Sequence, residues 1–336
     1  MDQETKLQLC RAIANIIQDY RNLNLGVEHV ARWINQFDID EQEIVLRGSL
    51  HLFERLYFSE SVFDRFVCDV QEFFARNSIE GYSLLDYQIN GSSQKELNAK
   101  FIRQNGNHEI NKAKRNIVYL DDFIFTGNRI KTDITKLFQA HDWFGIKDEH
   151  TIHIVTLGYF SYGKYKLEQS LREMANGMNR KVLFTFPSYE KYRLANNPNK
   201  LNEADVFCIS SAILESNQDI KEFLEDDLIG RQDLRTRDEN NSQIAFNGFP
   251  WRDDFERILI KHGIEIIQMC QQHSQCLKPL GYGSFPPGFG ATVFTYRNCP
   301  NNAPLVYWWG SLEETDNPAM QWYPLLPRQT YESREV

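Results

Sequence analysis

The chain has 336 residues, of which 42% are hydrophobic and 25% are charged, as expected for one large α/β domain or two smaller ones. Its formal net charge of −9 at pH 7 does not attract nucleic acid or an anionic membrane, so nucleic-acid binding would need a local basic patch. With no apolar run of about 18 residues and no signal-peptide pattern, we expect a cytoplasmic protein with no membrane segment and with reduced cysteines.

Residues 1–80 are predicted to be helical. Apolar residues recur at helical spacing in KLQLCRAIANIIQDY, in VEHVARWINQF and in two later segments. Because no segment rich in Pro, Gly or Ser separates this region from residues 81–336, we expect an all-α N-terminal extension that packs against the rest of the chain.

From residue 81 the pattern changes to alternating strands and helices. Short apolar strands are predicted at YSLLDYQI, NIVYL, TIHIVTL and KVLFTF, with helical segments between them. Strands separated by helices pair in parallel, and near-continuous apolar strands are typical of a sheet covered on both faces. We therefore expect residues 81–250 to form an α/β core with an open parallel sheet flanked by helices.

The C-terminal half contains two segments of different character. Residues 225–248 are polar and carry Arg231, Arg235 and Arg237 among acidic residues, which predicts a solvated surface loop or lid. Residues 251–336 begin with a helical pattern and continue with Gly, Pro and aromatic residues. There, ATVFTYR and LVYWW are predicted to form a β-hairpin, which makes this segment a β-rich C-terminal extension.

The segment NIVYLDDFIFTGNRI is the strongest candidate for a functional site. Asp121 and Asp122 follow four apolar residues at the predicted carboxyl end of a strand, where open parallel sheets bind ligands. Thr126 and Gly127 then lead into a helix, whose N-terminus offers unpaired N–H groups to an anion. The two aspartates could accept hydrogen bonds from sugar hydroxyls or bind a cation, and the turn beside them could bind an anion. A phosphorylated sugar would use both sites. The alternative is that the acids only terminate a strand before an ordinary turn.

This pattern of apolar residues, Asp-Asp and Thr-Gly resembles the phosphoribosyl-diphosphate motif of type I phosphoribosyltransferases. The resemblance implies that Asp121 and Asp122 are the catalytic pair, which holds the ribose hydroxyls and binds Mg²⁺. It also implies that the next residues wrap the 5′-phosphate: Phe125, Thr126, Gly127, Asn128 and Arg129. Members of the family usually end the motif with Thr or Ser, whereas this chain has Arg129, whose guanidinium can still clamp a phosphate.

A second loop extends the same interpretation. In type I enzymes the loop after the first core strand grips pyrophosphate, and here DYQINGSSQKEL follows the first predicted strand. Ser93, Gln94 and Lys95 are the candidates, because a small residue permits an unusual turn and lysine supplies charge. A plain solvated loop is an equal alternative.

The C-terminal region resembles that of phosphoribosyltransferase-like proteins encoded in bacterial conflict and anti-phage loci, including retron-associated ones. The shared stretches are Gly-Tyr-Gly at 281–283 and Cys-Pro-Asn-Asn at 299–302. The resemblance implies an effector of anti-phage defence that binds phosphoribosyl diphosphate and Mg²⁺, acts with protein partners or as a homo-oligomer, and transfers or releases the phosphoribosyl group. The alternative is a catalytically inactive nucleotide-binding or scaffold subunit, which Arg129 favours.

Cys270, His273 and Cys276 recur at three-residue steps in a predicted helix. This spacing could bring three soft ligands to one Zn²⁺. A fourth ligand is missing nearby, so a helix face with buried thiols is the favoured interpretation.

Overall fold

The computed structural model places the chain in two compact units, one of residues 1–60 with 196–329 and one of residues 61–195. These units do not follow the predicted segments 1–80, 81–250 and 251–336, because the first N-terminal helices associate with the C-terminal part. The structure describes the following residues: 1–88, 93–106, 108–112, 114–139, 149–177, 181–187, 192–226, 234 and 236–329.

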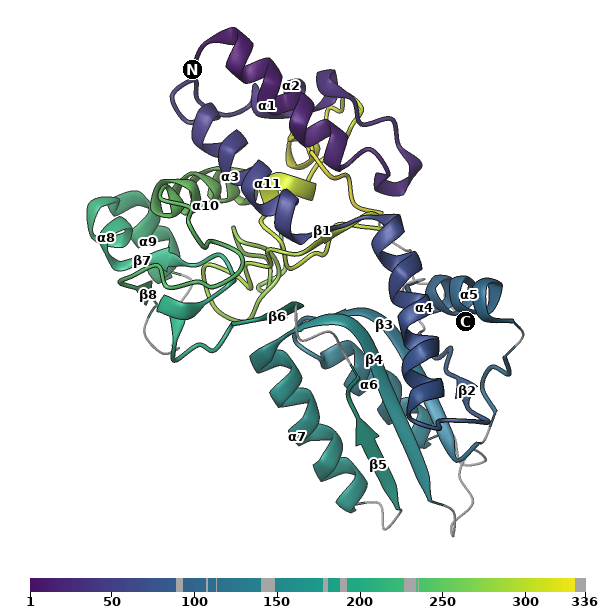
Figure 1. Cartoon of the computed structure of the whole chain (residues 1–336). Helices are drawn as coiled ribbons and strands as arrows, with labels where there is room; N and C mark the ends of the chain where they lie inside the picture. The colour runs from purple at the N-terminus through teal and green to yellow at the C-terminus, as the bar shows by residue number, and fades with distance from the viewer. Residues whose placement is uncertain are drawn as a thin grey trace. The chain divides into compact units, whose positions relative to one another are not determined.

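A parallel sheet is the centre of the unit of residues 61–195 (Figure 1). Its neighbouring strands, in order, are β2 (Ser83–Leu84), β3 (Asn116–Ile124), β4 (His150–Phe160) and β5 (Val182–Thr185). A fifth strand, β6 (Arg193–Leu194), pairs with the last two residues of β4. All of these pairs are parallel, so the open parallel sheet predicted from the sequence is confirmed.

Helices cover both faces of this sheet, as the apolar strands predicted. They are α4 (Glu60–Arg76), α5 (Ser93–Asn105), α6 (Asn128–Gln139) and α7 (Ser161–Gly177). Apolar residues of α6 and α7 form one core with strand residues such as Ile152 and Ile154. The neighbouring His153 points to the other face by strand alternation, and its ring lies 6.0 Å from that of Phe74 in α4. Helix α5 is tied to α4 by the ion pair of Lys100 with Asp64.

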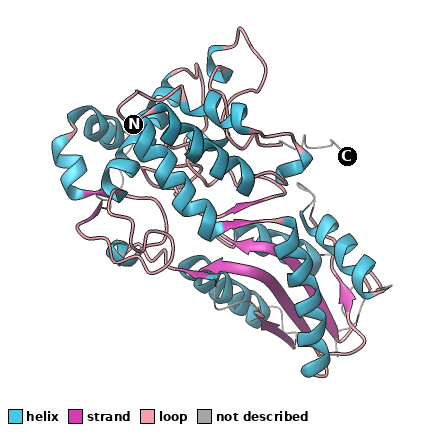
Figure 2. Cartoon of the chain, turned by 45° about the horizontal axis from the view of Figure 1, so that its top comes forward, coloured by secondary structure: helices cyan, strands magenta, loops and turns pink. Residues whose placement is uncertain are grey.

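The other unit is mainly helical (Figure 2). Its helices are α1 (Gln3–Ile16), α2 (Val27–Ile34), α3 (Gln42–Leu56), α8 (Ser211–Ser216), α9 (Gln218–Asp226), α10 (Arg252–Gln268) and α11 (Leu305–Trp308). Single 3-10 turns lie at Tyr20–Asn22, Leu201–Glu203 and Pro318–Met320. The predicted N-terminal helices are confirmed. No helix in the described ranges has both the length and the apolar character that a membrane span requires.

Two short parallel strand pairs complete this unit. Strand β1 (Tyr57–Phe58) pairs with β9 (Phe294–Thr295), and β7 (Ile209–Ser210) pairs with β8 (Thr236–Arg237). The predicted β-hairpin of ATVFTYR and LVYWW is therefore wrong, because β9 pairs with β1 and the second segment forms α11. Every residue of α11 is buried, and a short apolar run that is buried all round has no periodicity to separate helix from strand.

Within the predicted lid, residues 238–241 are exposed and irregular as expected, but Arg237 is not solvated. Arg231 and Arg235 lie outside the described residues, but Arg237 lies in β8 and is only 2% exposed. Its guanidinium pairs with Glu256, which is fully buried on α10. A paired and hydrogen-bonded charge can be buried where an unpaired one cannot, and the local charge pattern does not reveal this partner.

Candidate functional site

The two adjacent aspartates lie inside β3 rather than at its end, because the strand continues to Ile124. Asp121 is fully buried and pairs in register with Thr156 of β4, whereas the side chain of Asp122 is 18% exposed. Of the two predicted catalytic acids, Asp122 is therefore the one that solvent reaches.

Arg129, in the first turn of α6, forms an ion pair with Asp121. Its Nη2 donates to both carboxylate oxygens of Asp121, at 2.7 Å and 2.6 Å, and lies 3.5 Å from Oδ1 of Asp122. Burial raises the pKa of Asp121 to about 6, although the guanidinium of Arg129 lowers it. The guanidinium side chain itself remains 43% exposed, so a ligand in solvent can reach it.

The predicted phosphate-binding turn lies between β3 and α6. Gly127 has a φ of 77°, in the left-handed region, and a Cβ there would lie 2.7 Å from the Cβ of Leu167. The backbone of α7 is equally close, because a Cβ on Gly163 would lie 1.8 Å from the carbonyl oxygen of Phe125. Thr126 and Asn128 on this turn are exposed. Two glycines thus permit the close packing of α7 that shapes this solvent-facing turn before α6.

The second predicted loop is held by Gln94, which is fully buried near the start of α5. Its Oε1 accepts the backbone N–H groups of Tyr87 at 2.7 Å and Gln88 at 3.2 Å, and its own N–H donates to Oε1 of Gln88. Gln94 therefore closes the loop instead of facing solvent. Lys95 is exposed, and Ser93 begins α5. Residues 89–92 lie outside the described ranges, so pyrophosphate binding by this loop stays a prediction.

Three polar residues that the sequence did not single out accompany the aspartates: Tyr119, Asp133 and Thr156. The hydroxyl of Tyr119 donates to Oδ2 of Asp133 at 2.7 Å, which links β3 to α6. Thr156 is fully buried beside Asp121, and its hydroxyl has no hydrogen-bond partner among the residues that the structure describes. A threonine inside the apolar segment TIHIVTL was the available signal, but its neighbour could not be known before β3 and β4 were paired.

The predicted helical face of Cys270, His273 and Cys276 does not form. Helix α10 ends at Gln268, before the first of these residues, and Cys276 is exposed. These three side chains do not gather their ligand atoms, although all of them lie within the described ranges. The zinc hypothesis for this segment is therefore not supported, and the helix face with buried thiols that we favoured is wrong as well.

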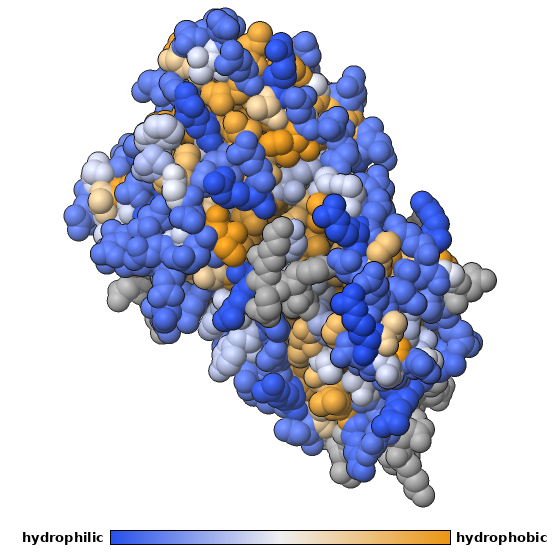
Figure 3. Space-filling model, viewed as in Figure 1, coloured by the Kyte–Doolittle hydropathy of each residue, from blue (hydrophilic) through white to orange (hydrophobic). Residues whose placement is uncertain are grey.

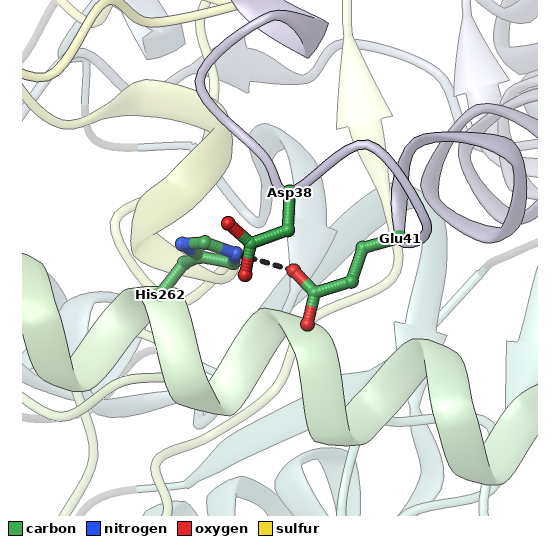
Figure 4. A group of neighbouring side chains, drawn as sticks. All are labelled: Asp38, Glu41 and His262. Atoms are coloured by element: carbon green, nitrogen blue, oxygen red, sulfur yellow. Dashed lines mark hydrogen bonds and ion pairs between the residues drawn. The ribbon is translucent and has the colours of Figure 1, made fainter.

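A different trio does gather its ligand atoms within 4.8 Å: Asp38, Glu41 and His262 (Figure 4). Nε2 of His262 lies 2.7 Å from Oε2 of Glu41, and its Nδ1 lies 2.7 Å from Glu265. Lys261 contacts both Asp38 and Glu41 through its ammonium group, at 3.0 Å for Glu41. Since lysine already supplies the positive charge between the carboxylates, this group is an ion-pair network and not a metal site.

This network predicts a pH-dependent stability. Hydrogen bonds from His262 and Lys261 outweigh burial and lower the pKa of Glu41 to about 2, and bonds to Glu265 and Glu41 outweigh burial and raise the pKa of His262. The contribution of Glu41 is present above its ordinary pKa of 4.5 and is lost as the pH falls toward about 2. The contribution of His262 is present below 6.5 and is lost as the pH rises through its higher folded value.

We expect Glu41→Gln to lower the free energy of unfolding by about 1.5 to 3 kcal/mol at about pH 5.5, the typical value of a hydrogen bond to a charged group. The loss should shrink toward about pH 3 and above about pH 8, where the wild type loses the same interactions. Urea unfolding at three pH values measures this. The control is Glu265→Gln, whose side chain is 47% exposed and should matter less. An equal loss at every pH would contradict the prediction.

The two C-terminal stretches, Gly-Tyr-Gly at 281–283 and Cys-Pro-Asn-Asn at 299–302, lie against each other. The backbone N–H of Tyr282 donates to the carbonyl oxygen of Asn301, and Nδ2 of Asn302 donates to the carbonyl oxygen of Tyr282, both at 2.8 Å. Gly281 has a φ of 92°, and a Cβ there would lie 2.4 Å from the backbone of residues 302 and 303. Glycine is therefore required where these two segments meet.

The comparison with known proteins agrees with this combination of sheet, turn and C-terminal region. The model of the PRTase-CE family matches residues 30–328, a range that includes the aspartate pair, the glycine turn and the C-terminal stretches. No curated protein and no solved structure matches the chain. The family match covers most of the sequence, and the chain therefore belongs to the PRTase-CE family of phosphoribosyltransferase-like proteins.

Proposed function

We propose that this protein binds phosphoribosyl diphosphate together with Mg²⁺ and transfers or releases the phosphoribosyl group. The observation that carries the proposal is the exposed turn between β3 and α6, with Gly127 in a left-handed conformation, directly after the aspartate pair. A helix of 12 residues follows this turn, so its N-terminus offers N–H groups to a phosphate. Asp122 on the strand offers its carboxylate to the ribose hydroxyls of the same molecule.

Arg129 would take part by exchanging partners. In the unliganded protein its guanidinium is held by Asp121, and its exposed portion lies in the first turn of α6. A 5′-phosphate at that turn would be a second anion for the same guanidinium, which can bind phosphate oxygens in a bidentate manner. Departure of pyrophosphate would leave an oxocarbenium-like ribose, and catalysis would come mainly from positioning and from charge stabilisation.

The oxygen atoms at this site suit Mg²⁺, because Mg²⁺ prefers the oxygens of carboxylates and phosphates as ligands. Asp122 fits best, since Asp121 already accepts Arg129 on both oxygens. Asp122, with Asp121 after release of Arg129, would hold the ion. When bound, Mg²⁺ would neutralise charge on the diphosphate.

The biological role that we propose is that of an effector in bacterial anti-phage defence, acting with protein partners. Two features support it. The stretches at 281–283 and 299–302, which carry the resemblance to conflict-associated proteins, meet in one hydrogen-bonded contact. The N-terminal helices also pack into the same unit as this C-terminal region.

A second candidate function is nucleotide binding without turnover, as a scaffold subunit. The specific observation that favours it is the ion pair between Arg129 and Asp121, which occupies one of the two acids expected to hold the ribose. Release of pyrophosphate on incubation with phosphoribosyl diphosphate and Mg²⁺ would separate the two functions, because binding without release fits only the scaffold.

The primary test is calorimetric titration of phosphoribosyl diphosphate, with Mg²⁺, into the wild type and into Asp122→Asn. We expect saturable binding to the wild type and binding weaker by roughly 10- to 100-fold in the variant, the loss for one hydrogen bond to a charged group. The double variant Asp121→Asn/Asp122→Asn should lose binding altogether.

The control is Asp133→Asn on α6, the helix that also carries Arg129, because this side chain accepts a hydrogen bond from Tyr119 and is outside the proposed ligand set. Circular dichroism confirms that each variant is folded. Unchanged affinity in the folded double variant would overturn the assignment of the aspartates, and absence of binding by the folded wild type would overturn the proposed function.

A further inference from the structure

A cavity of about 330 Å³ lies beside α4 in the unit of residues 61–195. Its described lining includes three residues of α4, Phe66, Val70 and Phe73, and also Phe186, which follows β5. In the view of Figure 3, apolar residues reach the surface of this unit among hydrophilic neighbours. An apolar cavity of about 150 Å³ can hold a benzene molecule, so this cavity has room for an aromatic side chain.

We propose that two copies of this chain associate through α4, and that Phe73 of each copy fills the cavity of the other. The two helices would form an antiparallel pair about a two-fold axis. This inference does not rest on the proposed function, because it uses none of the residues assigned to phosphoribosyl diphosphate.

Helix α4 carries a stripe of four residues that solvent reaches. Asp69, Glu72, Phe73 and Arg76 are spaced at i, i+3, i+4 and i+7, which places them on one side of the helix. Phe73 is 37% exposed, and the side chains of Glu72 and Arg76 are exposed beside it. Because Phe73 also lines the cavity, a partner that covers this stripe would remove apolar surface of both from water.

The charges of this stripe complement themselves in an antiparallel pair. When the two-fold axis passes between Glu72 and Phe73, Asp69 of each helix lies opposite Arg76 of the other, since both residues are equally far from the axis. Symmetry makes this contact between opposite charges occur twice. Arg76 already pairs with Glu72 of its own helix, so its guanidinium would lie between two carboxylates.

The lining of the cavity favours the same occupant. Among the described residues that line it, Asp69 is the one that carries a charge, and the others are mainly apolar. A suitable occupant therefore brings an aromatic ring to Phe66 and a cation to Asp69. The α4 helix of a second copy supplies both from one side, because Phe73 and Arg76 are three residues apart.

The first measurement is sedimentation velocity of the full chain at increasing concentration. One pair of helices buries less area than a standard protein interface, so we expect a reversible dimer with a dissociation constant of roughly 10 to 100 µM. The dimer should weaken as the salt concentration rises, because contacts between charges at the rim of an interface are screened.

The variant that tests the cavity is Phe73→Ser. We expect its dissociation constant to rise at least about 30-fold, the effect of removing an aromatic hot-spot residue from an interface. The control is Tyr165→Ser on α7, which makes the same kind of change at an aromatic residue that is 54% exposed. Tyr165→Ser should keep the affinity of the wild type.

The variants that test the charges are Arg76→Asp and the exchange Asp69→Arg/Arg76→Asp. The single change places like charges opposite each other and should weaken the dimer about tenfold or more, whereas the exchange should restore it to within about threefold of the wild type. The control is Arg172→Asp on α7, because Arg172 is also exposed and also pairs with a glutamate four residues earlier. That control should leave the dimer unchanged.

Three outcomes would overturn the inference: the wild type stays monomeric over the whole concentration range, Phe73→Ser dimerises as well as the wild type, or the charge exchange does not restore the dimer. The first would leave the cavity to another occupant, and the second would show that the copies meet elsewhere. Circular dichroism confirms that each variant is folded. Phe73→Ser and Arg76→Asp change exposed side chains, so the test does not depend on the double variant alone.

Discussion

Arg129→Met is expected to lower the free energy of unfolding by about 3 kcal/mol at about pH 8, the low end for breaking a buried ion pair. The reason is that Asp121, which is fully buried, would lose both hydrogen bonds from the guanidinium and keep its charge without the cation that compensates it. The low end applies because Arg129 itself is 43% exposed. Chemical unfolding in urea measures the difference.

The loss should depend on pH in a defined direction. Burial raises the pKa of Asp121 to about 6 even with Arg129 present, and removal of the guanidinium removes the influence that lowers it. A buried carboxyl with a raised pKa is favourable for folding below its ordinary value of 3.8, and this contribution is lost as the pH rises through the folded value. The deficit of Arg129→Met should therefore be largest at alkaline pH and shrink as the pH falls.

A double variant provides the control for this prediction. Asp121→Asn/Arg129→Met removes the charge together with its partner and should recover much of the lost stability at about pH 8, because no uncompensated charge remains. Equal stability of the wild type and Arg129→Met at about pH 8 would contradict the prediction. It would show that the ion pair contributes nothing to the fold and leaves Arg129 available to a ligand.

The second large effect is expected for Glu256→Gln in the other unit. The carboxylate of Glu256 is fully buried between two arginines that are also buried, at 2.6 Å from Nη2 of Arg237 and 2.9 Å from Nε of Arg252. It also accepts the backbone N–H of Cys208. Loss of its charge leaves two guanidinium groups away from water, which is expected to cost about 3 to 5 kcal/mol.

The matched control for Glu256→Gln is Asp253→Asn on the same helix. Asp253 also contacts Arg237, but its side chain is 52% exposed. A solvent-exposed ion pair contributes about 1 kcal/mol or less. Urea unfolding should therefore give a large loss for Glu256→Gln and a small one for Asp253→Asn. Similar losses in the two variants would mean that burial does not decide the strength of this network.

The sequence predicted the sheet and the turn for identifiable reasons. The apolar segments NIVYL and TIHIVTL are long enough and apolar enough that strands buried on both faces were the expected outcome, and they form β3 and β4. The Thr-Gly step before α6 was also informative, because glycine tolerates the left-handed conformation that Gly127 adopts. These features depend on residues close together in the chain.

The wrong predictions concern segments whose secondary structure or burial depends on residues far away in the sequence. Leu305–Trp308 forms a helix instead of half a hairpin, and β9 pairs with β1, which lies far away in the sequence. Arg237 is buried because Glu256 on α10 compensates its charge, and no local pattern shows that pairing. Local charge alone predicted a solvated loop at this position.

By itself, the sequence determined the parallel α/β core, the N-terminal helices and the position of the aspartate pair before a glycine turn, because apolar periodicity and backbone conformation are local properties. Only the tertiary structure decided that Arg129 holds Asp121, that Gln94 is buried in its own loop, and that Thr156 is buried beside Asp121. The physical reason is that the energy of a buried charge or hydroxyl depends on which groups the fold brings within hydrogen-bonding distance.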